Sequence, residues 1–188
     1  MSRWVCHLWR WGMRLLFCAS LIANGFQGSR ILKLEDLIAG RRNPGPREGE
    51  IVTGFNATSL NGGVQRIEFS SSSHPTLLYV FSPSCVWCER NSPAVGALAR
   101  QVSGRYRVIG LSVSSERVKE FVAQHHIEFP VYTEPPAAIV KAYELGVTPE
   151  TIMVSTNGRI DCVWTGAYQN SIKASIEQFL SVRLPALE

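Results

Sequence analysis

The sequence predicts an α/β domain with a central mixed β-sheet flanked by helices. Two continuous apolar runs, "TLLYVFS" from Thr76 and "RVIGLSV" from Arg107, are typical of strands buried on both faces. Each run is followed by a segment with helical periodicity, and this order favours parallel strands joined by helical crossovers. Near the C-terminus, "ETIMVSTNGRIDCVWTG" predicts a β-hairpin around its Asn-Gly turn, which adds antiparallel strands at the other side of the sheet.

The remaining elements are predicted from caps, turns and periodicity. The triplet "NGG" separates two β-favouring segments and predicts an N-terminal hairpin. Ser114 or Ser115 can cap one helix, Asn170 or Ser171 can cap another, and Gly146 is expected to close a third. The predicted strands are residues 51–60, 64–69, 76–82, 107–113, 129–134, 150–156 and 159–166, and the predicted helices are residues 86–102, 114–127, 136–146 and 170–182.

Composition indicates one globular domain without a nucleic-acid face. The chain has 188 residues, of which 45% are hydrophobic and 18% are charged, as expected of an ordinary globular protein. Its net charge is +4, but the residues before Arg47 carry +5 and the rest carries −1. Phosphate binding needs a concentrated positive surface, so nucleic acid is not an expected partner of the main domain.

The first 25 residues are expected to be a signal peptide or a membrane anchor. Scattered positive charge precedes an apolar run from Leu15 to Ala23, which is shorter than the roughly 20 residues that span a bilayer and fits a secretory signal. Small residues allow cleavage after Gly25, while a retained anchor or a buried N-terminal helix are the alternatives. We therefore predict an exported, periplasmic protein, either free or anchored to the inner membrane, with a linker at 26–46 and one domain at 47–188.

Cys85 and Cys88 stand two residues apart, at the junction between a predicted buried strand and a helix. A structural zinc site needs four ligands, and the sequence has neither a second cysteine pair nor suitably spaced histidines, so no metal is expected. A structural disulfide across two residues closes too small a loop to restrain the unfolded chain strongly. A redox-active pair is therefore the preferred interpretation.

The predicted positions of the two thiols suit disulfide exchange without a cofactor. Cys85 lies at the start of the helix, where unpaired N–H groups and aligned peptide dipoles favour an anion, so its pKa is expected to be lower than that of a free thiol. Cys88 lies one turn further along and deeper, within reach of a mixed disulfide formed on Cys85. The pair can thus attack a disulfide and then resolve the intermediate.

The strand–CxxC–helix unit resembles the thioredoxin superfamily. Pro93 lies five residues after Cys88, where that family has the proline that kinks the active-site helix, and "GVTPETIMV" is similar to the loop in which a cis-proline faces the CxxC. Thr148 and Pro149 occupy those loop positions. The predicted export, the N-terminal hairpin and the segment around "HHIEFPVYTE" resemble in particular the TlpA/ResA group of exported thiol–disulfide oxidoreductases, with a redoxin (AhpC/TSA-like) domain.

The resemblance implies a three-layer thioredoxin-like fold with an N-terminal β-hairpin extension. It also implies that Cys85 and Cys88 are the catalytic pair, and that the backbone of Thr148, beside Pro149, pairs with an extended substrate. Trp87 is expected either to contact the partner or only to cover the buried thiol. The implied partners are protein thiols or disulfides, such as apocytochrome c or a copper-site protein, together with an upstream thiol reductant or oxidant in the membrane or in solution.

The chain departs from the family pattern close to the cysteine pair. Ser84 stands where thioredoxins have a tryptophan, and Val86-Trp87 replaces their interior Gly-Pro. Many TlpA/ResA relatives have an acidic residue three positions after the second cysteine, where it accepts a proton from the buried thiol, but this chain has Asn91. The proton acceptor for Cys88 therefore stays open.

Two other functions are compatible with parts of the pattern. A peroxiredoxin-type thiol peroxidase shares this scaffold, and Ser82 lies three residues before Cys85 as its signature requires. However, Leu78 occupies the place of the signature proline. A non-catalytic binding module that keeps the fold as a scaffold is the second alternative, and it predicts that Cys85→Ser leaves the function intact.

Overall fold

The computed structural model describes residues 45–70 and 72–187. The predicted signal or anchor at residues 1–25, and the predicted linker up to residue 44, lie outside the described residues. In the described part, no helix is long and apolar enough to cross a membrane. The elements are β1 (Phe55–Ser59), β2 (Val64–Ile67), β3 (Thr76–Phe81), α2 (Val86–Val102), β4 (Arg107–Ser112), α3 (Val118–Gln124), β5 (Val131–Thr133), α4 (Ala137–Ala142), β6 (Glu150–Val154), β7 (Ile160–Thr165) and α5 (Asn170–Leu180).

The strands form one mixed seven-stranded sheet in the order β2-β1-β5-β4-β3-β6-β7. β3, β4 and β5 are parallel, whereas the N-terminal hairpin (β1 and β2) and the C-terminal hairpin (β6 and β7) are antiparallel. β3 lies between β4 and β6, and all six of its residues are buried. The predicted α/β class with a central mixed sheet is confirmed.

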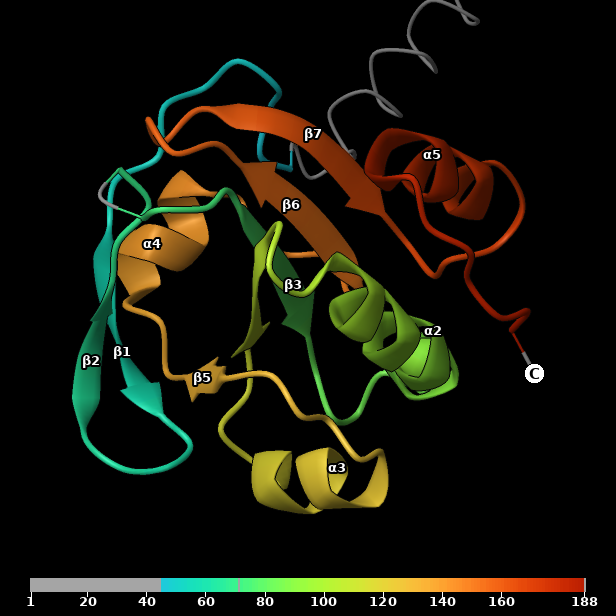
Figure 1. The fold of residues 1–188 in the computed structure, drawn as a ribbon. Helices are drawn as coiled ribbons and strands as arrows, with labels where there is room; N and C mark the ends of the chain where they lie inside the picture. The colour runs from blue at the N-terminus through green and yellow to red at the C-terminus, as the bar shows by residue number, and fades with distance from the viewer. Residues whose placement is uncertain (1–44, 71, 188) are drawn as a thin grey trace, which may run out of the picture. The chain divides into compact units, whose positions relative to one another are not determined.

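The sheet lies between two apolar layers, which β3 divides by the alternation of its side chains. Leu77, Tyr79 and Phe81 belong to a cluster with the buried faces of α2 and α5. Leu78 and Val80 belong to a second cluster, with α4 and the N-terminal hairpin. Figure 1 shows the helices around the sheet, with α2 directly following β3. The helices α2 and α5 cover one face of the sheet and α4 covers the other. These three layers are what a thioredoxin-like fold requires.

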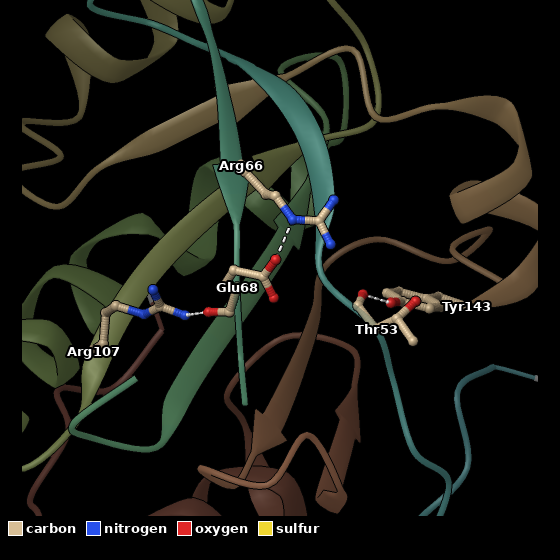
Figure 2. Close-up of polar contacts among 5 residues, drawn as sticks. All are labelled: Thr53, Arg66, Glu68, Arg107 and Tyr143. Atoms are coloured by element: carbon tan, nitrogen blue, oxygen red, sulfur yellow. Dashed lines mark hydrogen bonds and ion pairs between the residues drawn. The ribbon is translucent and has the colours of Figure 1, made fainter. Parts of the chain in front are cut away.

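Polar contacts join the N-terminal hairpin to the rest of the domain (Figure 2). Arg107, at the start of β4, donates to the backbone carbonyl of Glu68 just after β2 and to the Thr76 hydroxyl. On the other side of the hairpin, the Tyr143 hydroxyl donates to the carbonyl of Thr53. These contacts fix the hairpin as part of the domain.

Several predicted boundaries are wrong. Asn170 and Ser171 do not cap α5 but lie inside it, because Gln169 is the N-cap residue. Ile51 does not extend β1 but forms an isolated β-bridge with Arg159, which lies just before β7. α3 begins at Val118 rather than at Ser114 or Ser115, because Arg117 in front of it has a left-handed backbone with φ 53°. α4 ends before Gly146, since Glu144 has φ 49° and already breaks the helical path.

Candidate active site

A tight turn delivers Cys85 from the end of β3 to the N-terminal cap of α2. The hydroxyls of Ser82 and Ser84 are 2.9 Å apart, and the Cys85 N–H donates to the Ser82 carbonyl at 3.1 Å. The Cys85 carbonyl then accepts hydrogen bonds from the N–H groups of Cys88 (3.0 Å) and Glu89 (3.1 Å), which begin the helix. The half-buried Cys85 side chain therefore stands where the first N–H groups of α2 are exposed.

Cys85 is the more acidic of the two thiols. Burial by itself would raise its pKa, but hydrogen bonds to the sulfur from the Thr148 side chain, from the Cys88 thiol and from the backbone N–H groups of Cys88 and Trp87 outweigh burial, so the pKa is lowered from its ordinary value. Two of these donors are backbone groups of the first helical turn. The expectation that the start of the helix lowers the pKa of Cys85 thus agrees with the groups that lie around its sulfur.

The pKa of Cys88 is shifted in the opposite direction to that of Cys85. Its side chain is fully buried in the layer between the sheet and α2. Burial raises the pKa of Cys88 to about 12, and the hydrogen bond and the charge of Cys85 act in the same direction. Both cysteines are unpaired thiols in this structure. At neutral pH the pair therefore consists of one accessible, ionisable thiol and one buried thiol that keeps its proton.

The Thr148-Pro149 loop faces Cys85 from the other side. The Cys85 Sγ–H donates to the Thr148 carbonyl at 3.3 Å, and the Thr148-Pro149 peptide bond is cis. This loop leads into β6, which pairs with β3, so two segments 63 residues apart meet at one edge of the sheet. The carbonyl can accept only while the thiol is protonated, and ionisation of Cys85 frees it for another donor.

A serine repairs the interruption that Pro93 makes in α2. Residue 93 has no N–H to donate to the Glu89 carbonyl four residues earlier, and the Ser92 hydroxyl donates to that carbonyl instead, at 2.7 Å. The Ser92 oxygen is also 2.9 Å from Nδ1 of His125. Because the single hydroxyl hydrogen is already used, His125 Nδ1–H must be the donor in that contact. The end of α3 is thereby tied to the active-site helix, one turn beyond Cys88.

Three exposed apolar side chains stand next to Cys85 and Thr148 in the sequence. Val86 is 59% exposed, Trp87 is 46% exposed and Val147 is 41% exposed. The guanidinium of Arg90 lies over the Trp87 ring, 5.3 Å from its centroid. The Trp87 ring is therefore partly exposed, and its two expected roles, contacting a partner or covering the buried thiol, stay predictions.

Residues 49–163, well over half of the chain, match the model of the AhpC/TSA family. The chain belongs to the AhpC/TSA family. This AhpC/TSA member is 27% identical over 120 residues to a thioredoxin-like protein of Haemophilus influenzae, covering 62% of this chain and 70% of that protein. It is 24% identical over 147 residues to the thiol-disulfide oxidoreductase ResA of Halalkalibacterium halodurans, covering 74% and 78%.

Among solved structures, the AhpC/TSA member resembles a Chlorobium tepidum protein described as a candidate thiol:disulfide interchange protein DsbE. The TM-score is 0.63 at 17% sequence identity, covering 72% of this chain and 97% of the other, and this likeness establishes the fold. The predicted thioredoxin-like fold and the predicted resemblance to thiol–disulfide oxidoreductases are confirmed.

Sequence reasoning missed Tyr79, which lies in the same buried layer as Cys88 in this AhpC/TSA domain. Asn91, which the sequence marked as a departure, is fully buried, and its Oδ1 accepts the Tyr168 N–H at 2.8 Å. Tyr79 has the one polar group on the Leu77–Tyr79–Phe81 face of β3. A polar atom on an otherwise apolar strand face, six residues before Cys85, is the signal that could have identified it.

Proposed function

We propose that this protein is a thiol–disulfide oxidoreductase that exchanges disulfides with exported protein substrates through Cys85 and Cys88. The observation that carries the proposal is the contrast between the two thiols. Cys85 is half-buried with a lowered pKa, and Cys88 is fully buried one turn further along the same helix. Such an arrangement separates the attacking sulfur from the resolving sulfur.

The proposed reduction proceeds in two exchanges. The Cys85 thiolate attacks one sulfur of the substrate disulfide, the substrate S–S bond breaks, and the departing substrate sulfur takes up a proton. Cys88 then attacks Cys85 Sγ in the mixed disulfide and expels the second substrate sulfur, which also takes up a proton. Two electrons pass from the cysteine pair to the substrate, and a Cys85–Cys88 disulfide remains. The reverse sequence oxidises a dithiol.

Residues around the pair supply the proposed substrate contacts. The Thr148 carbonyl, freed when Cys85 ionises, is placed to accept an N–H from an extended substrate backbone, and Pro149 beside it offers no competing N–H. Trp87 is exposed and offers an apolar surface to the same substrate. An extended protein segment is therefore a better candidate substrate than a small disulfide.

Export completes the proposal. Residues 1–25 would act as signal or anchor and residues 26–46 as linker, which places the domain at 47–188 in the periplasm, where disulfides form and persist. Apocytochrome c and copper-site proteins are substrates of this kind, and an upstream thiol reductant or oxidant would regenerate the pair. The reduction potential sets the direction, because about −270 mV suits a reductant and about −120 mV suits an oxidant.

A trapping experiment with insulin as the disulfide substrate tests the function. In the Cys88→Ser variant the resolving thiol is missing, so a mixed disulfide between Cys85 and an insulin chain should accumulate and should disappear on reduction. The Cys85→Ser variant is the matched control and should form no such adduct. Equal adduct in both variants would contradict the proposal, and catalytic consumption of hydrogen peroxide by the reduced protein would support the peroxidase alternative instead.

A further inference from the structure

Two hydrogen-bond donors are buried in the active-site layer without acceptors. Tyr79 on β3 is 2% exposed and Asn91 on α2 is 0% exposed. Among the described residues, neither the Tyr79 hydroxyl nor Asn91 Nδ2 has a hydrogen-bond partner. A buried donor without an acceptor destabilises a fold, and most buried polar groups are paired. Two such donors in one layer therefore call for a functional explanation.

The orientation of the Asn91 amide is determined by its other end. Asn91 Oδ1 accepts the backbone N–H of Tyr168 at 2.8 Å, so the oxygen and the nitrogen of the amide are distinguished. The Asn91 amide lies near the Tyr79 hydroxyl without forming a hydrogen bond to it. The pKa of Tyr79 is raised first by burial and then by the proximity of Cys88 and Tyr168, while the proximity of the Asn91 amide lowers it. The Tyr168 hydroxyl is itself paired with the Thr151 hydroxyl at 2.6 Å. Tyr79 is thus the free phenolic donor beside Cys88.

The second exchange requires what these donors can supply. Cys88 must become a thiolate to attack the mixed disulfide. However, its side chain is fully buried, and burial raises its pKa to about 12, so it keeps its proton at neutral pH. Residue 91 offers an amide instead of a carboxylate, and the neighbouring Glu89 is exposed. A sulfur anion in such a layer is stabilised only by preorganised donors.

We propose that the Tyr79 hydroxyl, positioned by Asn91, donates a hydrogen bond to Cys88 Sγ as that sulfur ionises and so accelerates the second exchange. This inference rests on the proposed function. In the step, the Cys88 proton passes to the departing substrate sulfur, the Cys88–Cys85 bond forms and the Cys85–substrate bond breaks. Tyr79 keeps its own proton throughout, and Asn91 acts through Tyr79 as a positioning residue.

A stopped-flow reaction with 5,5′-dithiobis(2-nitrobenzoate) separates the two exchanges in the full reduced chain. The first coloured thiolate is released when Cys85 attacks, at a rate that depends on the reagent concentration. The second is released when Cys88 resolves the adduct, at a rate that does not. Cys6, Cys18 and Cys162 are replaced by Ser in all proteins compared, so that each colour change reports on the pair.

The Tyr79→Phe variant should keep the first rate and slow the second by roughly tenfold to a hundredfold, the range expected for one hydrogen bond to a charged group. The slowing should persist across the pH range in which the second rate rises with Cys88 ionisation. The titratable groups near Tyr79 are Cys88 from α2, Cys85 at the N-terminal cap of α2, and Tyr168 from the loop after β7. Tyr143→Phe is the matched control, because it removes a paired hydroxyl from the opposite layer, and both rates should be unchanged.

Each outcome decides between the alternatives. An unchanged second rate in Tyr79→Phe, or equal slowing in Tyr143→Phe, overturns the inference while leaving the proposed function intact. If the protein that keeps Tyr79, Cys85 and Cys88 shows no first phase, the proposed function itself is overturned. Should Tyr79→Phe fail to fold, Asn91→Leu removes the positioning amide and must slow the second phase selectively for the inference to stand.

Discussion

Replacing Ser92 by alanine should destabilise the active-site helix in a way that depends on Pro93. The Ser92 hydroxyl donates to the Glu89 carbonyl at 2.7 Å and accepts from Nδ1–H of His125 at 2.9 Å. Ser92→Ala removes both contacts at a position that is only 4% exposed. The Glu89 carbonyl is then left without a donor, because Pro93 has none to give.

The expected magnitude follows from the two lost contacts. A typical hydrogen bond contributes about 1 kcal/mol net, and a buried polar group left unpaired costs roughly 1–3 kcal/mol. We therefore expect Ser92→Ala to lower the free energy of unfolding by about 2 kcal/mol. In a Pro93→Ala background, residue 93 has an N–H for the Glu89 carbonyl, so the same change should cost about 1 kcal/mol less.

Equilibrium urea denaturation of the reduced chain, followed by far-UV circular dichroism, measures the four free energies of this double-mutant cycle. Ser171→Ala on α5 is the control, since Ser171 is exposed and its loss should change stability by less than about 0.5 kcal/mol. An identical cost of Ser92→Ala with proline and with alanine at position 93 would refute the reasoning that the serine replaces the missing N–H.

Two further predictions concern the surface and the buried carboxyl. Trp87→Ala should leave the reaction with a small aromatic disulfide within about twofold but slow insulin reduction by about tenfold, because an exposed tryptophan contributes mainly to a protein contact; equal slowing of both reactions would count against a docking role. Burial raises the pKa of Glu150 above 4.5, so between 4.5 and that raised value the folded state binds more protons than the unfolded state and stability falls as pH rises. Glu150→Gln should remove this part of the pH dependence of the urea midpoint, and an unaltered pH profile would show that Glu150 is not its source.

The central elements could be predicted because their patterns are strong and local. The apolar run from Thr76 and the periodic segment from Val86 became β3 and α2, with bounds close to those expected. The start of α3 could not be predicted in the same way. Ser114 looks like a helix cap, but its hydroxyl accepts the N–H of Glu116 in a local turn, and the helix begins only after the left-handed Arg117.

Those parts of the candidate site that depend on the spacing of residues in a motif could be predicted from the sequence. Cys85, Cys88 and the Thr148-Pro149 loop were identified by motif, and the structure brings the first cysteine and the loop into contact. Tyr79 was not identified, because one sequence does not show which strand residue lies beneath a helix residue or which buried donors lack acceptors. Such facts arise from the packing of β3 against α2, which no local pattern encodes.

The acidity of Cys85 tests the central claim most directly. The rate of alkylation of each cysteine by iodoacetamide can be followed by mass spectrometry as a function of pH in the full reduced chain, because the thiolate is the reacting form. Cys162 is the internal reference, since burial and then the neighbouring Glu48 raise its pKa to about 11. We predict that Cys85 titrates below a free thiol and far below Cys162; a Cys85 midpoint at or above that of free cysteine would contradict the account.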